Sequence, residues 1–245
     1  MIKEDKKHIF LDSLDDLSTL KWMIFSNNGS NSNIYKYNKN ILLKIFKEHL
    51  PFSEIKYFED IKKLNINNVS LPQKFIIIDD KFYGYSMKFM PGKTLINLDD
   101  KVHYQDIVAT LPNIQNTIER FSKNKYQMCD LNIYNVLYDE IKNTFNIVDI
   151  DLYLKENNML YSEAYDFNAL SFQSLLLTAL TREFNYKRQE YKLYKKLKDI
   201  LLFGTLNNND YARNFTEIKN ELEDNYSEEI KTLKDLRKVI KKNNN

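Results

Sequence analysis

The feature that most constrains the fold is a change in hydrophobic pattern at Pro91 and Gly92. Before this pair, short apolar runs are separated by polar turns, which is the pattern of β-strands. After it, apolar residues recur every three or four positions over long stretches, as they do on one face of a helix. Because a Pro-Gly pair ends a strand, the sequence predicts a β-rich segment over residues 1–90 and an α-rich segment over 91–245.

The β-rich segment is expected to begin with a short capped helix over residues 12–20. Strands are expected over residues 22–25, 34–37, 41–46, 75–78 and 82–89, with tight turns at 38–40 and 79–81. A helix opened by Pro51 and Ser53 should run to about Leu64, because apolar residues recur there at helical spacing. These elements predict a mainly antiparallel sheet with one helix.

The α-rich segment should contain a helix over residues 107–121, with Pro112 as a break or a start, and a strand over 145–150. Helices are expected over 164–242, broken near 204–210 and 225–226. The predicted fold class is α+β. A single domain, 1–245, would comprise a small antiparallel β lobe with one helix (1–90) and a larger α-helical lobe (91–245). Ligands usually bind between two such lobes.

Composition narrows the possible functions. The single cysteine, Cys129, excludes an internal disulfide framework and a cysteine-based zinc site, and the three histidines are scattered. A net charge of +2 gives little reason to expect nucleic-acid binding, and the lysines between 231 and 242 are interpreted as a solvated helix face. Without a long apolar run or a secretory signal, a cytoplasmic protein with no membrane partner is expected.

The strongest functional signal lies at residues 130–137, DLNIYNVL, followed by NIVD at 146–149. The segment holds two carboxylates, Asp130 and Asp149, and the amide of Asn135. The alternative interpretation is a β-hairpin with incidental Asn and Asp residues in its turns.

The pattern D-L-x-x-x-N-V-L followed by I-V-D resembles the protein-kinase-like superfamily. This resemblance implies ATP and Mg²⁺ as cofactors, Asp130 as the catalytic base, and Asn135 and Asp149 as the metal ligands. Similarity to the family extends over roughly residues 22–181. It implies a two-lobed kinase-like fold and transfer of the γ-phosphoryl group to a hydroxyl acceptor.

A lysine, Lys44, is embedded in the apolar strand 41–46, where burying its ammonium group without a partner would be costly. An edge-strand lysine that points to solvent is the alternative. The resemblance implies that Lys44 acts in catalysis by binding the α- and β-phosphates, and that it pairs with a Glu on the next helix. Glu54 is preferred over Glu59 because it lies next to the apolar face, although a different helix alignment places Tyr57 there.

Two further segments are similar to nucleotide-binding parts of the family. Residues 27–35 resemble a degraded glycine-rich loop, in which Gly29 and Ser32 would let backbone N–H groups approach phosphates. Residues 85–95 resemble the strand and hinge that contact adenine. Met87 would close the back of that pocket, and backbone groups of Lys88 and Met90 would bind the adenine edge.

The chain departs from the protein-kinase pattern in several places. Met128 and Cys129 replace the usual His-Arg pair before Asp130. Only seventeen positions separate Asp149 from Asp166, which by resemblance begins a central helix and braces the catalytic loop. This interval lacks an A-P-E motif and puts recognition of a peptide in doubt.

We therefore expect an ATP-dependent kinase whose acceptor is a protein Ser/Thr hydroxyl or a small molecule. The alternative is a pseudokinase that acts as a nucleotide-binding or scaffolding module. The sequence leaves open the acceptor, the oligomeric state and the pathway.

Overall fold

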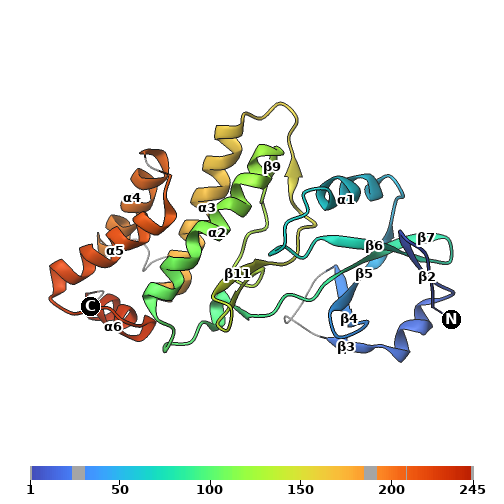
Figure 1. Cartoon of the computed structure of the whole chain (residues 1–245), viewed down its shortest axis with the longest axis horizontal. Coiled ribbons are helices and arrows are strands. Elements are labelled where there is room, and N and C mark those ends of the chain that lie inside the picture. The colour runs from blue at the N-terminus through green and yellow to red at the C-terminus, as the bar shows by residue number, and fades with distance from the viewer. Residues whose placement is uncertain (1, 24–30, 185–191, 208, 244–245) are drawn as a thin grey trace. The chain divides into compact units, whose positions relative to one another are not determined.

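The computed structural model describes residues 2–23, 31–184, 192–207 and 209–243 (Figure 1). Its described residues form an α+β fold with a mixed sheet. The chain divides into two compact units, Met1–Met90 and Pro91–Asn245, which are described separately below. No helix in the described part of the chain is long and apolar enough to cross a membrane.

The first unit is built on a seven-stranded sheet in the order β1-β2-β6-β7-β5-β4-β3. The strands are β1 (Lys3–Glu4), β2 (His8–Leu11), β3 (Lys21–Met23), β4 (Ser32–Lys36), β5 (Ile41–Leu50), β6 (Pro72–Ile78) and β7 (Lys81–Lys88). The sheet is mainly antiparallel, as predicted, but it is mixed because β2 pairs parallel to β6. Strands β1 and β2 were not predicted, since four residues such as His8–Leu11 are too few to show a period clearly.

The predicted hairpins and the short capped helix are present. Strands β4 and β5 pair antiparallel, as do β6 and β7. Asp79 and Asp80 both have positive φ, at 46° and 54°, which matches a two-residue turn of type I′. The capped helix is a 3₁₀-helix, η1 (Leu14–Thr19), and the Ser13 side chain accepts a hydrogen bond from the backbone N–H of Asp15.

Each face of this sheet carries an apolar cluster. One cluster includes Phe46, Phe75, Phe82 and Tyr85, and helix α1 (Glu54–Lys62) contributes Phe58 to it. The other cluster joins residues of β2, β5 and β6 to Leu17 of η1. Helix η1 therefore packs on this sheet face, to which β2 adds Ile9 and Leu11, and the sequence had assigned no partner to it. Both faces are buried, which explains the nearly continuous apolar runs in β5 and β6.

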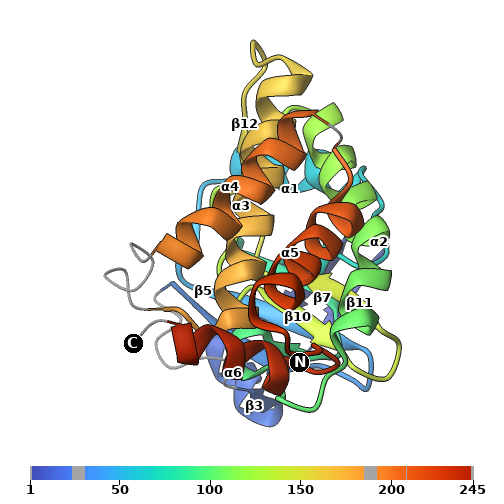
Figure 2. The ribbon, with the colours of Figure 1, turned by 90° about the vertical axis from the view of Figure 1, so that its left-hand side faces the viewer.

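The second unit contains α2 (Tyr104–Lys123), which lies beside α3 (Tyr161–Thr181) in two perpendicular views (Figures 1 and 2). Helices α4 (Lys192–Asn207), α5 (Tyr211–Tyr226) and α6 (Leu233–Asn243) follow. The predicted breaks near 204–210 and 225–226 are confirmed, although α4 runs through Gly204. Pro112, by contrast, neither breaks nor starts α2. Its ring is exposed, and the buried residues Leu111 and Ile114 on either side hold the helix together despite one missing backbone bond.

Short strands of the second unit position its loops. One sheet consists of β8 (Lys93–Thr94), β10 (Val136–Asp139) and β11 (Thr144–Ile147). The 3₁₀-helix η2 (Leu95–Asn97) lies between β8 and α2 along the chain. Strands β9 (Tyr126–Gln127) and β12 (Leu154–Lys155) form another. Strand β11 corresponds to the first part of the strand predicted over 145–150. Gly92, with φ at 132°, lets the chain pass close to the carbonyl of Tyr138, where a side chain would clash.

Helix α6 is fastened to the segment that precedes α2. Backbone N–H groups of Leu233 and Lys234 donate to the carbonyls of Val102 and Asp100, at 3.0 and 2.9 Å. The guanidinium group of Arg237 donates to the carbonyl of Leu98 at 3.3 Å and to the carboxylate of Asp100. These bonds make α6 an integral part of the second unit.

Candidate functional site

The loop between β9 and β10 brings Asp130 and Asn135 into direct contact. The side-chain Nδ2 of Asn135 donates to the Oδ2 atom of Asp130 at 2.8 Å and to the backbone carbonyl of Asp130 at 3.1 Å. Both bonds use the nitrogen end of the amide. Within the described residues no donor reaches Asn135 Oδ1, so this oxygen is available as a ligand for a cation.

Asp149 follows the strand that pairs with this loop. Val136 lies opposite Ile147 in the β10–β11 ladder, and the backbone N–H of Val148 donates to the carbonyl of Asn135 at 2.9 Å. Asp149 therefore directly follows Val148, whose backbone is hydrogen-bonded to Asn135. Its φ is 59°, a left-handed conformation that is uncommon for a residue other than glycine. Such strained residues concentrate at functional sites.

The structure therefore groups the three residues predicted from the 130–149 motif. Asn135 and Asp149 supply an amide and a carboxylate from neighbouring backbone segments. Such ligands suit magnesium, which takes oxygen ligands and is commonly held by one or two side chains together with phosphate and water. No group of three or more His, Cys, Asp or Glu side chains in the described ranges could hold a metal alone. Asn135 and Asp149 thus suit a cation that arrives with a phosphate-bearing ligand better than a permanently bound metal.

The residue that braces this loop is Asn168, which the sequence interpretation missed. Its Oδ1 accepts from the backbone N–H of Met128 at 2.7 Å. Its Nδ2 donates to the carbonyl of Tyr126 at 2.8 Å and to the hydroxyl of Ser122 at 3.0 Å. Asn168 is fully buried, at 0% exposure, so these bonds have no competition from water. They fix the backbone just before Asp130.

The bracing role predicted for Asp166 therefore requires a correction. Helix α3 begins at Tyr161, so Asp166 lies in its second turn, and its side chain is only partly buried. Asn168, two residues later, faces the loop because it lies on the buried side of α3 with Ala169 and Phe172. A signal was present in the sequence, since Asn168 is a polar residue at an apolar position of a helical repeat.

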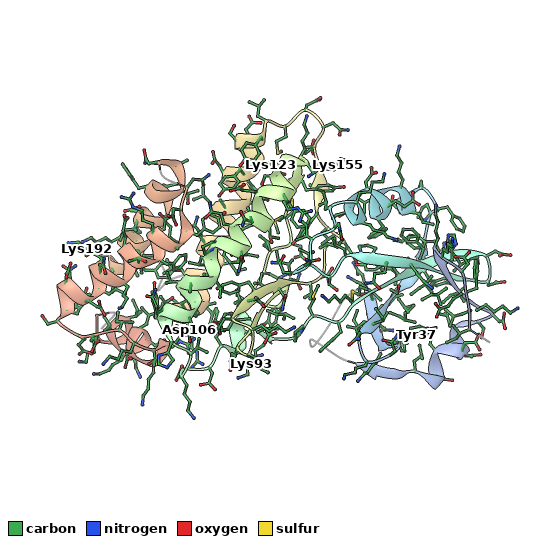
Figure 3. All side chains as sticks on the ribbon, viewed as in Figure 1. Tyr37, Lys93, Asp106, Lys123, Lys155 and Lys192 are labelled. Carbon is green, nitrogen blue, oxygen red and sulfur yellow. The ribbon has the colours of Figure 1, made fainter. Side chains whose placement is uncertain are left out.

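The interval after Asp149 is occupied by β12, which pairs with β9 directly before the loop. Leu154 lies opposite Gln127, and Lys155, which is labelled in Figure 3, lies opposite Tyr126. The ammonium nitrogen of Lys155 is 5.5 Å from the centre of the tyrosine ring. Leu154 is exposed, as is Cys129 on the other side of the ladder. The short interval thus forms a small strand beside Asp130.

In the first unit, Lys44 is buried, with 3% of its surface exposed. It lies in β5 opposite Ile34 of β4 and Tyr85 of β7, so it shares a sheet face with both. Leu42 and Phe46, two residues away on either side, point to the same face. The structure therefore excludes the alternative of a solvated edge-strand lysine.

Gly84 is a second residue that sequence reasoning missed. It lies opposite Ile45 in the β5–β7 ladder, and its φ is 151°. A methyl group at this position would clash with the backbone carbonyl oxygen of Lys44. Glycine is required here because β7 must approach β5 closely at the lysine.

The structure does not bring the preferred carboxylate, Glu54, to Lys44. Glu54 is the first residue of α1 and its side chain is exposed; among the described residues it makes no ion pair. Glu59 pairs instead with Lys7, at 3.9 Å. Tyr57 packs against the apolar cluster on the Lys44 face. The helix therefore presents aromatic and aliphatic side chains to that face.

The predicted adenine-binding segment lies at the end of β7. Met87 is buried opposite Leu42, on the face that also holds Lys44. The carbonyl of Lys88 already accepts a hydrogen bond from the hydroxyl of Ser70, at 2.8 Å, so one acceptor site on it is used. No hydrogen bond in the described part of the chain uses the backbone N–H or carbonyl of Met90. A planar heterocycle with adjacent donor and acceptor atoms could pair with the backbone N–H and carbonyl of Met90.

The segment predicted to be a glycine-rich loop lies partly outside the described residues. Gly29 lies outside the described residues. Ser32 is the first residue of β4 and lies opposite Phe46, so the strand begins inside the segment expected to be a loop. The backbone at Ser32 is therefore already part of the sheet ladder.

The sequence matches no protein-family model and no curated protein.

Proposed function

We propose that this protein is an ATP-dependent phosphotransferase that moves the γ-phosphoryl group to a hydroxyl acceptor. The observation that carries the proposal is the arrangement of Asp130, Asn135 and Asp149. The amide nitrogen of Asn135 is bonded to Asp130, and its oxygen is free beside the segment that ends in Asp149. The β9–β10 loop thus offers a proton acceptor, Asp130, bonded to one potential oxygen ligand, Asn135, and the paired segment after β11 offers the second, Asp149.

In the proposed reaction, the acceptor hydroxyl donates a hydrogen bond to the Asp130 carboxylate and its oxygen attacks the γ-phosphorus. The bond between that phosphorus and the β–γ bridging oxygen breaks, and ADP leaves with the bond's electron pair. The hydroxyl proton passes to Asp130 as the new P–O bond forms. Magnesium bound with the triphosphate would neutralise part of the developing charge, held by Asn135 and Asp149. Lys44 is assigned to the α- and β-phosphates.

The test is magnesium-dependent ATP consumption and phosphorylation of the protein itself and of a panel of hydroxyl acceptors. Asp130→Asn keeps the shape of the side chain but removes the base, so turnover should fall about 100-fold or more. Asp149→Asn should lower turnover and raise the magnesium concentration required. Asp224→Asn is the matched control, because Asp224 is exposed on α5. No turnover by the wild type with any acceptor would refute the proposal.

A second candidate is a nucleotide-binding module without turnover, and the exposed position of Glu54 favours it. An activating carboxylate is expected to pair with the phosphate-binding lysine in active kinases, and Glu54 makes no such pair. This candidate predicts that ATP with magnesium raises the melting temperature while the wild type and Asp130→Asn are equally inactive. Turnover that depends on Asp130 would exclude it.

A further inference from the structure

Asn132 uses both ends of its side-chain amide within the Asp130 loop. Its Nδ2 donates to Asp130 Oδ1 at 3.0 Å. Its Oδ1 accepts from the backbone N–H groups of Tyr134 and Asn135, at 2.9 and 3.1 Å. One end therefore contacts the carboxylate, and the other end holds the turn that leads to Asn135.

The carboxylate of Asp130 is held at both of its oxygens. Asn132 donates to Oδ1, and Asn135 donates to Oδ2 at 2.8 Å. Each carboxylate oxygen can accept two hydrogen bonds, so one site on each oxygen remains open. Rotation of the carboxylate would break these bonds. The two amides thus set the direction from which a hydroxyl can donate to Asp130.

The orientation comes from neutral groups. No cationic side chain in the described ranges forms an ion pair with Asp130. An amide donor fixes the plane of a carboxylate without neutralising it, so the carboxylate keeps its full charge for a proton in transit. The residue at position 132 therefore affects the orientation of the Asp130 carboxylate.

We propose that Asn132 is a positioning residue that aims the Asp130 carboxylate at the acceptor hydroxyl, an inference that rests on the proposed function. Asn132 does not touch the reacting atoms and acts only through Asp130. Misplacing a reacting group by about 1 Å can cost about 100-fold in rate. Loss of the Asn132 donor should therefore lower kcat without changing nucleotide binding.

Asn132→Asp separates the two uses of the side chain. An aspartate keeps an oxygen for the N–H groups of Tyr134 and Asn135, but it has no donor for Asp130 and repels it. Asn132→Ala removes both functions. Asn207→Asp is the charge-matched control, because Asn207 is exposed at the end of α4 and donates to the carbonyl of Phe203 at 2.7 Å.

The measurements are kcat, KM for ATP and melting temperature. Asn132→Asp is expected to lower kcat about 10- to 100-fold, while KM for ATP stays within about twofold. Its melting temperature should stay close to that of the wild type, and Asn132→Ala should lose both kcat and melting temperature. Asn207→Asp should match the wild type in all three.

Two results would overturn the inference while leaving the proposed function in place. Wild-type kcat in Asn132→Asp would show that Asn132 only braces the turn. An equal loss of melting temperature in Asn132→Asp and Asn132→Ala, with parallel losses of kcat, would show a purely structural role. Failure of the proposed function is recognised separately, because the wild type and Asp130→Asn would then be equally inactive.

Discussion

Replacing Asn168 by alanine should be among the most destabilising single changes in the second unit. The substitution removes three hydrogen bonds, which join α3 to Ser122, Tyr126 and Met128. The N–H of Met128 and the carbonyl of Tyr126 belong to residues that are each 1% exposed, so water cannot replace the lost partner readily. Leaving a buried polar group unpaired costs about 1–3 kcal/mol.

The two backbone groups together give a loss of about 4 kcal/mol in the free energy of unfolding. The hydroxyl of Ser122 adds little, because it still donates to the carbonyl of Ile118 at 2.9 Å. For a chain of 150–250 residues, each kcal/mol lowers the melting temperature by about 2–4 °C, so a fall of about 10 °C is expected.

The assay is urea unfolding followed by circular dichroism at 222 nm. This signal reports helices, which are concentrated in the second unit, whereas the single tryptophan, Trp22, lies in β3 of the first unit. Asn124→Ala is the control, because Asn124 is exposed at the end of α2 and its side chain donates to the carbonyl of Arg120 at 2.8 Å. An unfolding free energy for Asn168→Ala within about 0.5 kcal/mol of the wild type would refute the reasoning.

Two further predictions concern the sheet and α6. Gly84→Ala should destabilise the first unit by about 3 kcal/mol, because φ at 151° and the carbonyl of Lys44 both exclude a side chain. The measurement is Trp22 fluorescence during urea unfolding. Lys81→Ala is the control, because Lys81 is exposed. Asp235 has a lowered pKa because it accepts a hydrogen bond from the backbone N–H of Thr232. The stabilisation is present above the ordinary value of 3.8 and is lost as pH falls through the folded pKa. Asp235→Ala should therefore cost about 1 kcal/mol at pH 7, and a cost that does not shrink towards pH 2 would contradict this assignment.

Local chemistry decided which parts of the fold could be predicted from the sequence. The turn at Asp79 and Asp80 joins two strongly apolar runs, so the β6–β7 hairpin follows from nearest neighbours alone. Strand β2 could not be predicted, because its four residues gain their order by pairing with β6, more than sixty positions away. Pro112 was misleading because the packing of α2 outweighs one lost backbone bond.

The candidate site likewise contains residues that could be predicted from the sequence and residues that could not. Asp130, Asn135 and Asp149 could be grouped from the sequence because their spacing follows one loop and one hairpin. Asn168 occupies an apolar position of a helical repeat, but asparagine is abundant in this chain, and the bond to Met128 becomes evident only from tertiary packing. Glu54 was misplaced because helical spacing gives the face of a residue but not its distance from a neighbouring strand.

The fastening of α6 has a consequence for how the chain acquires its structure during synthesis. Arg237 holds the carbonyl of Leu98, which precedes it by 139 residues. The segment before α2 is therefore translated long before α6. Until α6 has been made, this segment lacks the hydrogen bonds that α6 provides. Contacts within the first unit are complete once residue 90 has been made. Since domains tend to fold as units while the chain emerges, the β-rich unit should be able to fold before the helical unit, which needs α6 to have been translated.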